Sequence, residues 1–341
     1  MSTTSEQCEV IAFLRQPGAW AGKPDRVEVI ETHGALVFLA GSEVLKVKRA
    51  VTLPYLDFST LEARRRYTER EIEINRPNAP EIYLGVAVVT READGRLAIG
   101  GQGPPVEWAV RMARFDQEHL LSRVVHAGGI GPAMAVALAE AVAGMHRGAK
   151  PLPRADDRIG EIAASILGAL ASNADDRVQQ SAARLHPAVD RALARSAEVR
   201  RERAAAGYVR RCHGDLHLAN IVLWRGRPVP FDAIEFDERL ATIDTLYDLA
   251  FLLMDLERQH ARAAANIVLN RFLFRTGDAL DLRGLAALPL FLGVRAAIRA
   301  IVGLDRAKLG AEAGHDPLTH ALETLALAER LLAPEPARLV A

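Results

Sequence analysis

The sequence has few cysteines, no excess of either charge and few lysines. Its two cysteines, Cys8 and Cys212, lie far apart in 341 residues. They cannot form a disulfide framework, which indicates a reducing compartment. Basic and acidic residues number 43 each, so the formal net charge is zero. Nothing in this balance favours nucleic acid or an anionic membrane as the main partner.

No targeting segment or long apolar run stands out. The first twenty residues lack the basic start and apolar stretch of a signal peptide. The longest apolar runs, such as "LAALPLFLGV", are too short to span a bilayer. We therefore expect a soluble cytoplasmic protein with no membrane partner.

Lysine is scarce because arginine supplies most of the positive charge. Only five of the 43 basic residues are lysines, and two of them, Lys46 and Lys48, occur in "EVLKVKRA". A lysine within an apolar strand pattern is therefore unusual in this chain, and this pair needs an explanation.

The first third of the chain is rich in strand patterns, and the remainder is mostly helical. Residues 27–50 predict three short antiparallel strands, the last two joined by a tight turn at Gly41-Ser42. A helix capped by Ser59 or Thr60 follows, and then strands in "PEIYLGVAVVT", "GRLAIGG" and "PPVEWAVRMARF". Helical periodicity marks 131–147, 156–172, 177–205, 242–272 and 283–333. These patterns predict an α+β protein with domains at 1–112 and 113–341.

One β-like interruption, "HGDLHLANIVLWRGRPVPFDAIEFDE", carries most of the chemistry. It predicts two short strands joined by a turn at residues 225–228. Asn220 would begin the first strand and Asp232 would lie in the second. Asp215 precedes both. Such a hairpin would bring Asn220 and Asp232 close together.

An Asp, an Asn and a second Asp are the residues that phosphoryl transfer requires. One carboxylate orients the attacking hydroxyl, and the other two side chains hold Mg²⁺ through oxygen atoms. The spacing His213–Asp215–Asn220 is H-x-D-x-x-x-x-N, that of a kinase catalytic loop. The pattern therefore predicts ATP and Mg²⁺ as cofactors, with Asp215 as base and Asn220 and Asp232 as metal ligands.

This chemistry also needs a phosphate-binding Lys on an earlier strand and a Glu on the next helix. Lys46 and Lys48 point to the same face of a strand, and we prefer Lys46. Glu71 is the best-placed partner, with Glu69 and Glu73 as alternatives. The ion pair would orient the Lys in a cleft.

Three segments, "HGDLHLANIVL", "PFDAIEFDE" and "ATIDTLYDLAFLLMDLE", resemble the aminoglycoside phosphotransferase and choline kinase-like superfamily. "FLAGSEVLKVKRAVTLPYLDFSTLEARRRYTEREIEINR" is similar to an uncharacterised bacterial branch of it, and the resemblance covers most of residues 30–260. It implies a protein-kinase-like bilobal fold, with a small antiparallel β-sheet lobe containing one helix and a larger, mainly helical lobe. It also implies transfer of the γ-phosphate of ATP to a small-molecule hydroxyl.

By the same resemblance, Asp215 is the catalytic residue and Asn220 and Asp232 hold the metal. Asp244 and Asp248 match a later acidic pair that anchors the loop and the following helix.

The resemblance also places a hinge at "VRMARF", where backbone atoms of Arg111, Met112 and Ala113 would bind adenine. Many members of this branch carry a P-loop ATPase domain after this one. No G-x-x-x-x-G-K-[ST] occurs here, which indicates the kinase-like domain alone.

Other interpretations remain open. His213, Asp215 and His217 form H-x-D-x-H, which also suits a metallohydrolase, although that leaves Asn220 and Asp232 unexplained. Lys46 and Lys48 are also compatible with edge-strand charges that block aggregation.

A nucleotide-binding regulatory protein of kinase fold is the alternative function. A protein kinase is less favoured because no "DFG" or "APE" segment occurs. Acidic residues near the motif would favour a cationic or polyol acceptor; they are Glu235, Asp237, Glu238, Asp255 and Glu257. The sequence leaves open the acceptor, ATP against GTP, and the oligomeric state.

Overall fold

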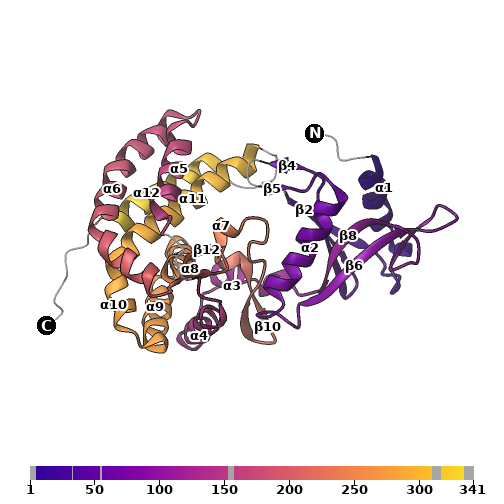
Figure 1. Cartoon of the computed structure of the whole chain (residues 1–341), viewed down its shortest axis with the longest axis horizontal. Coiled ribbons are helices and arrows are strands. Elements are labelled where there is room, and N and C mark those ends of the chain that lie inside the picture. Colours follow the sequence, from indigo (N-terminus) through magenta and orange to yellow (C-terminus); the bar gives the residue numbers. More distant parts are fainter. Residues whose placement is uncertain (1–4, 33, 54–55, 153–156, 309–315, 334–341) are drawn as a thin grey trace. The chain divides into compact units, whose positions relative to one another are not determined.

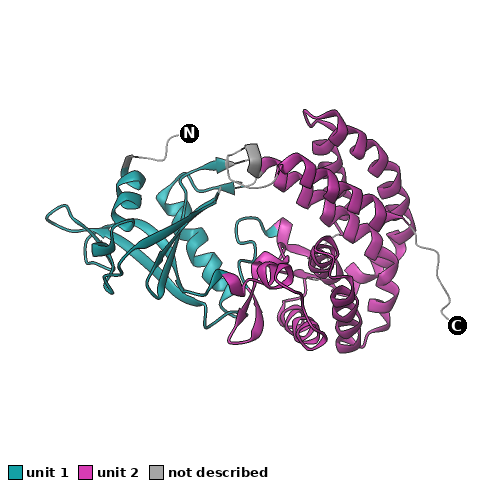
Figure 2. Ribbon diagram, turned by 180° about the vertical axis from the view of Figure 1, so that it is seen from behind, with its two compact units in different colours: residues 1–117, 231–238 teal, residues 118–230, 239–341 magenta. Residues whose placement is uncertain are grey.

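The computed structural model describes residues 5–32, 34–53, 56–152, 157–308 and 316–333. They group into two compact units (Figure 2). Unit 1 comprises residues 1–117 and 231–238, and unit 2 comprises residues 118–230 and 239–341. A domain boundary at 112/113 stays a prediction. The compact units instead divide after Gln117, and a later segment returns to unit 1.

The main sheet of unit 1 has six antiparallel strands in the order β1–β2–β3–β8–β6–β7, of which β2, β8 and β6 are labelled in Figure 1. In that order the strands are Val27–Glu31, Ala35–Ala40, Glu43–Lys48, Pro105–Ala113, Tyr83–Arg91 and Leu97–Ile99. A separate short hairpin pairs β4 (Thr52–Leu53) with β5 (Leu56–Asp57). The strands predicted over 27–113 are confirmed.

Local chemistry explains the predicted turn and helix start. Gly41 adopts φ 61°, a left-handed conformation that glycine accepts without strain, and it joins β2 to β3. Thr60 caps α2 (Leu61–Asn75), because its hydroxyl accepts a hydrogen bond from the N–H of Ala63 at 3.1 Å.

One face of the sheet packs against an apolar cluster. Phe38 and Leu45 are paired across β2 and β3 and are fully buried on the apolar face. Val10 and Leu14 of α1 (Ser5–Leu14) belong to the same apolar cluster. The sequence predicted one helix in this part of the chain, so α1 is an addition to that prediction.

Helix α2 packs on β8 and β6 through a polar stripe (Figure 1). Its buried residues Arg64, Thr68, Glu71 and Asn75 recur every three or four positions and so share one face. Arg64 donates to the buried carboxylate of Glu107 at 2.9 Å. The stripe therefore lies against charged partners rather than an apolar core.

Unit 2 is mainly helical. In chain order, α3 to α12 are Leu121–His126, Pro132–Gly148, Ile159–Ala171, Asp176–Ala205, Glu238–Ala241, Thr245–Arg258, Arg262–Thr276, Ala279–Gly284, Leu288–Lys308 and Pro317–Leu332, with α7 beginning at the last residue of unit 1. The predicted helix over 242–272 is two helices, α8 and α9. The α+β class predicted from the sequence is confirmed.

One stretch of unit 2, Ala279–Asp305, is long and apolar enough to cross a membrane by length and composition alone. It exceeds the apolar runs visible in the sequence because it joins α10 to α11. Half of its most apolar window is buried. Leu290, Phe291 and Val294 belong to the large apolar core of the unit, so part of this stretch is packed there.

Candidate active site

Lys46 lies at the centre of a buried ionic cluster in unit 1. Its Nζ lies 2.9 Å from Oε1 of Glu71 and 2.5 Å from Oδ1 of Asp232. The expected ion pair between Lys46 and Glu71 is therefore present. Burial disfavours the charge of Lys46, but Asp232 and Glu71 outweigh it and raise the pKa of Lys46 well above its usual value.

Lys48 forms a second, deeper pair with the same glutamate. Its Nζ lies 2.7 Å from Oε2 of Glu71, and it also pairs with Glu235. The Lys48 side chain is 1% exposed against 15% for Lys46, and its Nζ lies 5.0 Å from the ring centre of Phe58. Lys48 is thus enclosed, and Lys46 is the lysine that retains access to solvent.

The shared carboxylate of Glu71 gives a pH prediction for stability. Burial raises the pKa of Glu71, but Lys46 and Lys48 outweigh this effect and lower it from 4.5 to about 2. A depressed carboxyl pKa stabilises the fold above about pH 4.5, and this stabilisation is lost as the pH falls towards 2. Wild type should exceed Glu71→Gln by about 3 kcal/mol in unfolding free energy at pH 7. Urea unfolding at pH 7 and near pH 3 measures the difference, which should shrink in acid; a gap independent of pH contradicts the ion-pair assignment.

Asp232 does not lie in a strand, contrary to the sequence-based prediction. Strand β11 (Arg227–Pro230) ends two residues earlier, and Asp232 lies in the loop that follows with φ 62°. Pro228 and Pro230 supply no N–H to a ladder, which explains why the strand stays short.

Two residues that the sequence analysis missed hold this loop. The hydroxyl of Tyr83 accepts a hydrogen bond from the N–H of Asp232 at 3.0 Å. The side-chain oxygen of Asn75 accepts one from the N–H of Ala233 at 2.8 Å. Neither residue belongs to a motif, and only their burial in the fold reveals the contacts.

In unit 2, Asp215 and Asn220 meet directly. Asn220 ends a 3₁₀ turn, Leu218–Asn220, rather than beginning β10 (Ile221–Trp224) as predicted. Its side-chain nitrogen donates to Oδ2 of Asp215 at 2.9 Å and to the carbonyl of Asp215 at 3.0 Å. Both of these contacts of the side-chain nitrogen are with one residue, so Asn220 is oriented by Asp215.

His217 fixes the carboxylate of Asp215. Its Nδ1 accepts a hydrogen bond from the N–H of Ala219 at 3.2 Å, so Nε2 carries the proton. That Nε2 lies 3.3 Å from Oδ2 of Asp215. Burial raises the pKa of Asp215, but His217 and the charge of Arg299 outweigh it and hold that pKa well below its usual range. Asp215 is therefore ionised at neutral pH.

Two aspartates of α8 hold the loop that carries Asp215. Asp248 accepts the N–H of His213 at 3.1 Å and that of Gly214 at 2.9 Å. Asp255 lies two turns further along the helix and accepts the N–H of Leu218 at 3.0 Å. Asp248 thus anchors the loop, as the resemblance implied.

Further contacts complete this support. His146 bonds Asp248 at 2.9 Å through Nε2, and Arg295 donates to the carbonyl of Gly214 at 3.0 Å. Asp244 caps α8 and accepts two hydrogen bonds of 2.8 Å from the buried Arg203. His146, Asp255 and Arg295 were not predicted to act here, because nothing in their local sequence indicates a contact so distant along the chain.

Two of the acidic residues expected to favour a cationic acceptor are instead paired with basic residues of the fold. Glu235 is 7% exposed and pairs with Lys48, and Asp255 is 1% exposed and pairs with Arg258. Both charges are compensated within the fold. They give no support to a cationic acceptor.

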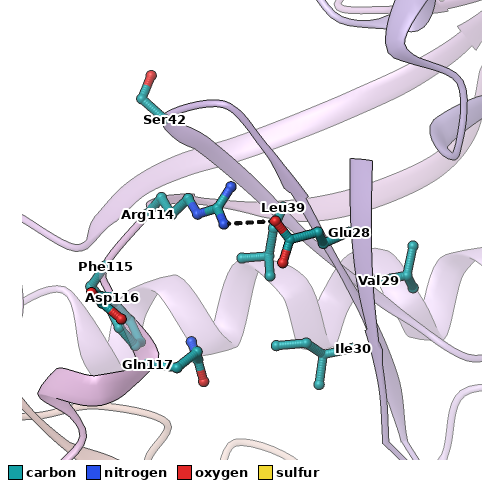
Figure 3. A pocket seen from close by; sticks show the side chains of 9 residues that line it. All are labelled: Glu28, Val29, Ile30, Leu39, Ser42, Arg114, Phe115, Asp116 and Gln117. Carbon is teal, nitrogen blue, oxygen red and sulfur yellow. Dashed lines mark hydrogen bonds and ion pairs between the residues drawn. The ribbon is translucent and has the colours of Figure 1, made fainter. Parts of the chain in front are cut away.

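Unit 1 also contains a pocket of about 600 Å³ (Figure 3). Its lining residues come from β1, β2, the turn after β2 and the segment after β8; they are Glu28, Val29, Ile30, Leu39, Ser42, Arg114, Phe115, Asp116 and Gln117. Ile30 pairs with Val37, and Val37 pairs with Lys46. Directly paired residues share a face of the sheet, so Ile30 of the pocket and Lys46 lie on the same face.

The predicted hinge residues lie just before this pocket. Arg111, Met112 and Ala113 are within β8 and pair with β3. The N–H of Ala113 donates to the carbonyl of Ile82 at 2.9 Å, and the N–H of Arg114 donates to that of Ser42 at 3.1 Å. The pocket is lined by the residues that follow, not by Arg111–Ala113.

Unit 1 has the antiparallel sheet with helix α2 packed on it, and unit 2 the mainly helical body, of a protein-kinase-like fold. The sequence profile of the "Phosphotransferase enzyme family" matches residues 70–287, and the chain belongs to this family. The uncharacterized proteins Rv2004c of Mycobacterium tuberculosis (strain ATCC 25618 / H37Rv) and Mb2027c of Mycobacterium bovis (strain ATCC BAA-935 / AF2122/97) are each 32% identical to it over 303 residues. The alignment covers 86% of this chain and 58% of each relative, so the chain spans less than two thirds of their length.

Solved structures have the same fold at low identity. A choline/ethanolamine kinase family protein from Mesorhizobium loti gives a TM-score of 0.51 at 15% identity, covering 96% of this chain and 95% of its own. A GDP and kanamycin complex of APH(2")-IIia gives 0.54 at 14% identity, covering 95% and 98%. The kinase-like fold implied by the resemblance is confirmed.

Proposed function

We propose that this protein transfers the γ-phosphate of ATP to a hydroxyl group of a small molecule, with Mg²⁺ as cofactor. Membership of the phosphotransferase family and the kinase-like neighbours support the general class. The observation that carries the proposal is the pairing of Asp215 with Asn220 in unit 2, together with the cluster of Lys46, Glu71 and Asp232 in unit 1. We also propose a cytoplasmic location, from cysteine usage alone.

The nucleotide is assigned to the sheet face that carries Lys46. The pocket that Ile30 and Leu39 help to line has the volume of a small-ligand site. Its apolar side chains suit a purine base. The N–H groups of Ala113 and Arg114 already donate to other carbonyl groups. Backbone contacts to the base would therefore come from the residues that follow Arg114. Lys46 would bind the phosphates, as its partial exposure allows.

The residues present fit a magnesium ion. Asp232 in unit 1 has a carboxylate whose side chain is 39% exposed, and Asn220 in unit 2 has an amide oxygen; each is proposed as a ligand from its own chemistry. Hard oxygen donors of this kind are what Mg²⁺ prefers. When bound, the ion would neutralise charge on the transferred phosphoryl group. The role of Lys46 is then to share Asp232 with the cation while Glu71 holds its Nζ in place.

Asp215 acts on the acceptor. Asn220 and His217 both contact Oδ2 of Asp215 and so fix the carboxylate, which in this proposal orients the acceptor hydroxyl. Its low pKa makes it a weak base that orients the hydroxyl and takes the proton late, as suits a loose phosphoryl transfer. His217 holds the carboxylate, which assigns it a supporting role and not that of a metal ligand.

The alternative is a nucleotide-binding regulatory protein without transfer. It would keep the pocket and Lys46 but would not need the bonds that orient Asp215. Those bonds favour the enzyme.

Calorimetric titration with ATP, with and without Mg²⁺, tests the nucleotide assignment. Binding should strengthen with Mg²⁺, and GTP titrated in parallel decides the base preference. A library of small hydroxyl compounds with γ-labelled ATP then identifies the acceptor, with sugars, amino alcohols and hydroxy acids as separate pools. The absence of any nucleotide binding contradicts the proposal.

A further inference from the structure

Segment Phe231–Glu238, here called the return segment, belongs to unit 1, although the chain on both sides of it belongs to unit 2. It contains Asp232, which the proposed function makes a metal ligand. The contacts that hold this segment on unit 1 therefore set the position of Asp232.

Two hydrogen bonds hold the backbone of the return segment at Asp232 and the residue after it. Tyr83 accepts the N–H of Asp232 at 3.0 Å, and Asn75 accepts the N–H of Ala233 at 2.8 Å. The amide nitrogen of Asn75 donates to the carbonyl of Glu71 at 3.0 Å, which fixes the orientation of its side chain.

An ion pair holds the same segment three residues further on. Glu235 pairs with Lys48, and Lys48 in turn pairs with Glu71 at 2.7 Å. A single glutamate of α2 thereby links Lys46, which contacts Asp232, to Lys48, which contacts Glu235.

These holding side chains are buried. Tyr83 is fully buried at the start of β6, Asn75 is 3% exposed at the end of α2, and Lys48 is 1% exposed at the end of β3. Three separate elements of unit 1 therefore contact one short segment.

The backbone at Asp232 needs such support. Its φ of 62° is a left-handed conformation that a residue other than glycine rarely adopts. A conformation of this kind persists where surrounding contacts determine it. The bonds to Tyr83 and Asn75 act on either side of the strained residue and direct its carboxylate towards Nζ of Lys46, 2.5 Å away.

We propose that Tyr83, Asn75 and Lys48 are positioning residues that dock the return segment on unit 1. They present Asp232 and Lys46 together as one preformed part of the nucleotide site. None of the three is assigned a contact with substrate or cation. This inference rests on the proposed function in its use of Asp232 as a metal ligand, but the docking itself concerns the free protein.

Tyr83→Phe tests the docking, because it removes the one hydroxyl that accepts the hydrogen bond and keeps the ring. Tyr67→Phe is the matched control, since Tyr67 lies on α2 and packs on Phe58 in the same unit. The Mg²⁺ concentration that half-saturates the strengthening of ATP binding should rise about 10-fold in Tyr83→Phe and stay unchanged in Tyr67→Phe. ATP binding measured in EDTA should be equal in both variants and wild type.

Hydrogen–deuterium exchange of the ligand-free protein gives a readout that needs no activity. Amides of the return segment should exchange faster in Tyr83→Phe and in Asn75→Ala, while β3 and β8 keep their protection. Unchanged exchange together with an unchanged Mg²⁺ requirement overturns the proposal. Equal loss of ATP binding with and without Mg²⁺ also overturns it, because the hydroxyl would then support unit 1 as a whole. If wild type binds no nucleotide, the proposed function fails, and the exchange comparison still decides the docking.

Discussion

Asp215→Asn should lower turnover by about 10³-fold and leave ATP binding within about twofold of wild type. The amide keeps the shape of the side chain but cannot accept the proton of the acceptor. Because Asn220 and His217 both donate to the carboxylate, the loop also loses charge-assisted hydrogen bonds. Steady-state kinetics with the acceptor from the library screen, beside calorimetry with ATP and Mg²⁺, separates the two effects.

Asp190→Asn provides the matched control. Asp190 also lies in unit 2 and contacts a histidine, His186, at 3.1 Å, but its side chain is 61% exposed. Its replacement should leave turnover unchanged. Since the pKa of Asp215 is held far below neutral, wild-type turnover should show no acid limb from this group between about pH 5 and 8. Equal turnover of Asp215→Asn and wild type rules out the catalytic assignment.

Asp232→Ala should also lower turnover by about 10³-fold, but through a different loss. Cations stabilise the transferred phosphoryl group by several kcal/mol, and one tenfold change in rate corresponds to about 1.4 kcal/mol. Removing this carboxylate also breaks the ion pair of Lys46 with Asp232 and keeps its pair with Glu71. In Asp232→Ala, Mg²⁺ should therefore no longer strengthen ATP binding. Calorimetry at several Mg²⁺ concentrations measures this loss.

The control for this variant is Asp94→Ala in the same unit. Asp94 is half exposed and pairs with the exposed Arg96, so its removal should have little effect. An Asp232→Ala protein whose ATP affinity still rises with Mg²⁺ as in wild type would refute the assignment of Asp232 as a metal ligand.

The sequence predicted most of the regular structure, because turn and capping residues mark it locally. The strands over 27–113, the cap at Thr60 and the helices α4, α5 and α6 follow from patterns of a few neighbouring residues. The strand predicted to contain Asp232 was wrong, since two prolines end β11 early. Helix α1 was missed, although Glu6 in its first turn and Pro17 three residues beyond its end are recognisable signals.

The site could be predicted only as far as its residues belong to spaced motifs. Lys46, Glu71, Asp215, Asn220 and Asp232 come from such motifs, and the contacts of Lys46 with Glu71 and of Asp215 with Asn220 are present. The supporting contacts join residues far apart in the chain. Tyr83 and Asp232 are separated by 149 positions, and His146 and Asp248 by 102.

The burial of Glu71 differs from what the composition of its helix indicates. A helix as rich in Glu and Arg as α2 is usually solvated, yet Glu71 is fully buried there. Two lysines on one strand compensate that charge, which makes burial of the carboxylate tolerable. The spacing of Lys46 and Lys48 indicated a shared face, but it did not indicate that both reach the same glutamate.

The central claim is that this chain moves phosphate from a nucleotide to a small hydroxyl compound through Asp215. The most direct measurement is transfer of label from γ-labelled ATP to the acceptor library, run in parallel with wild type, Asp215→Asn and Asp190→Asn. We predict labelled product with wild type and Asp190→Asn, and about 10³-fold less with Asp215→Asn. Labelled product at the same rate from all three proteins, or tight ATP binding by wild type with no product from any pool, contradicts the claim.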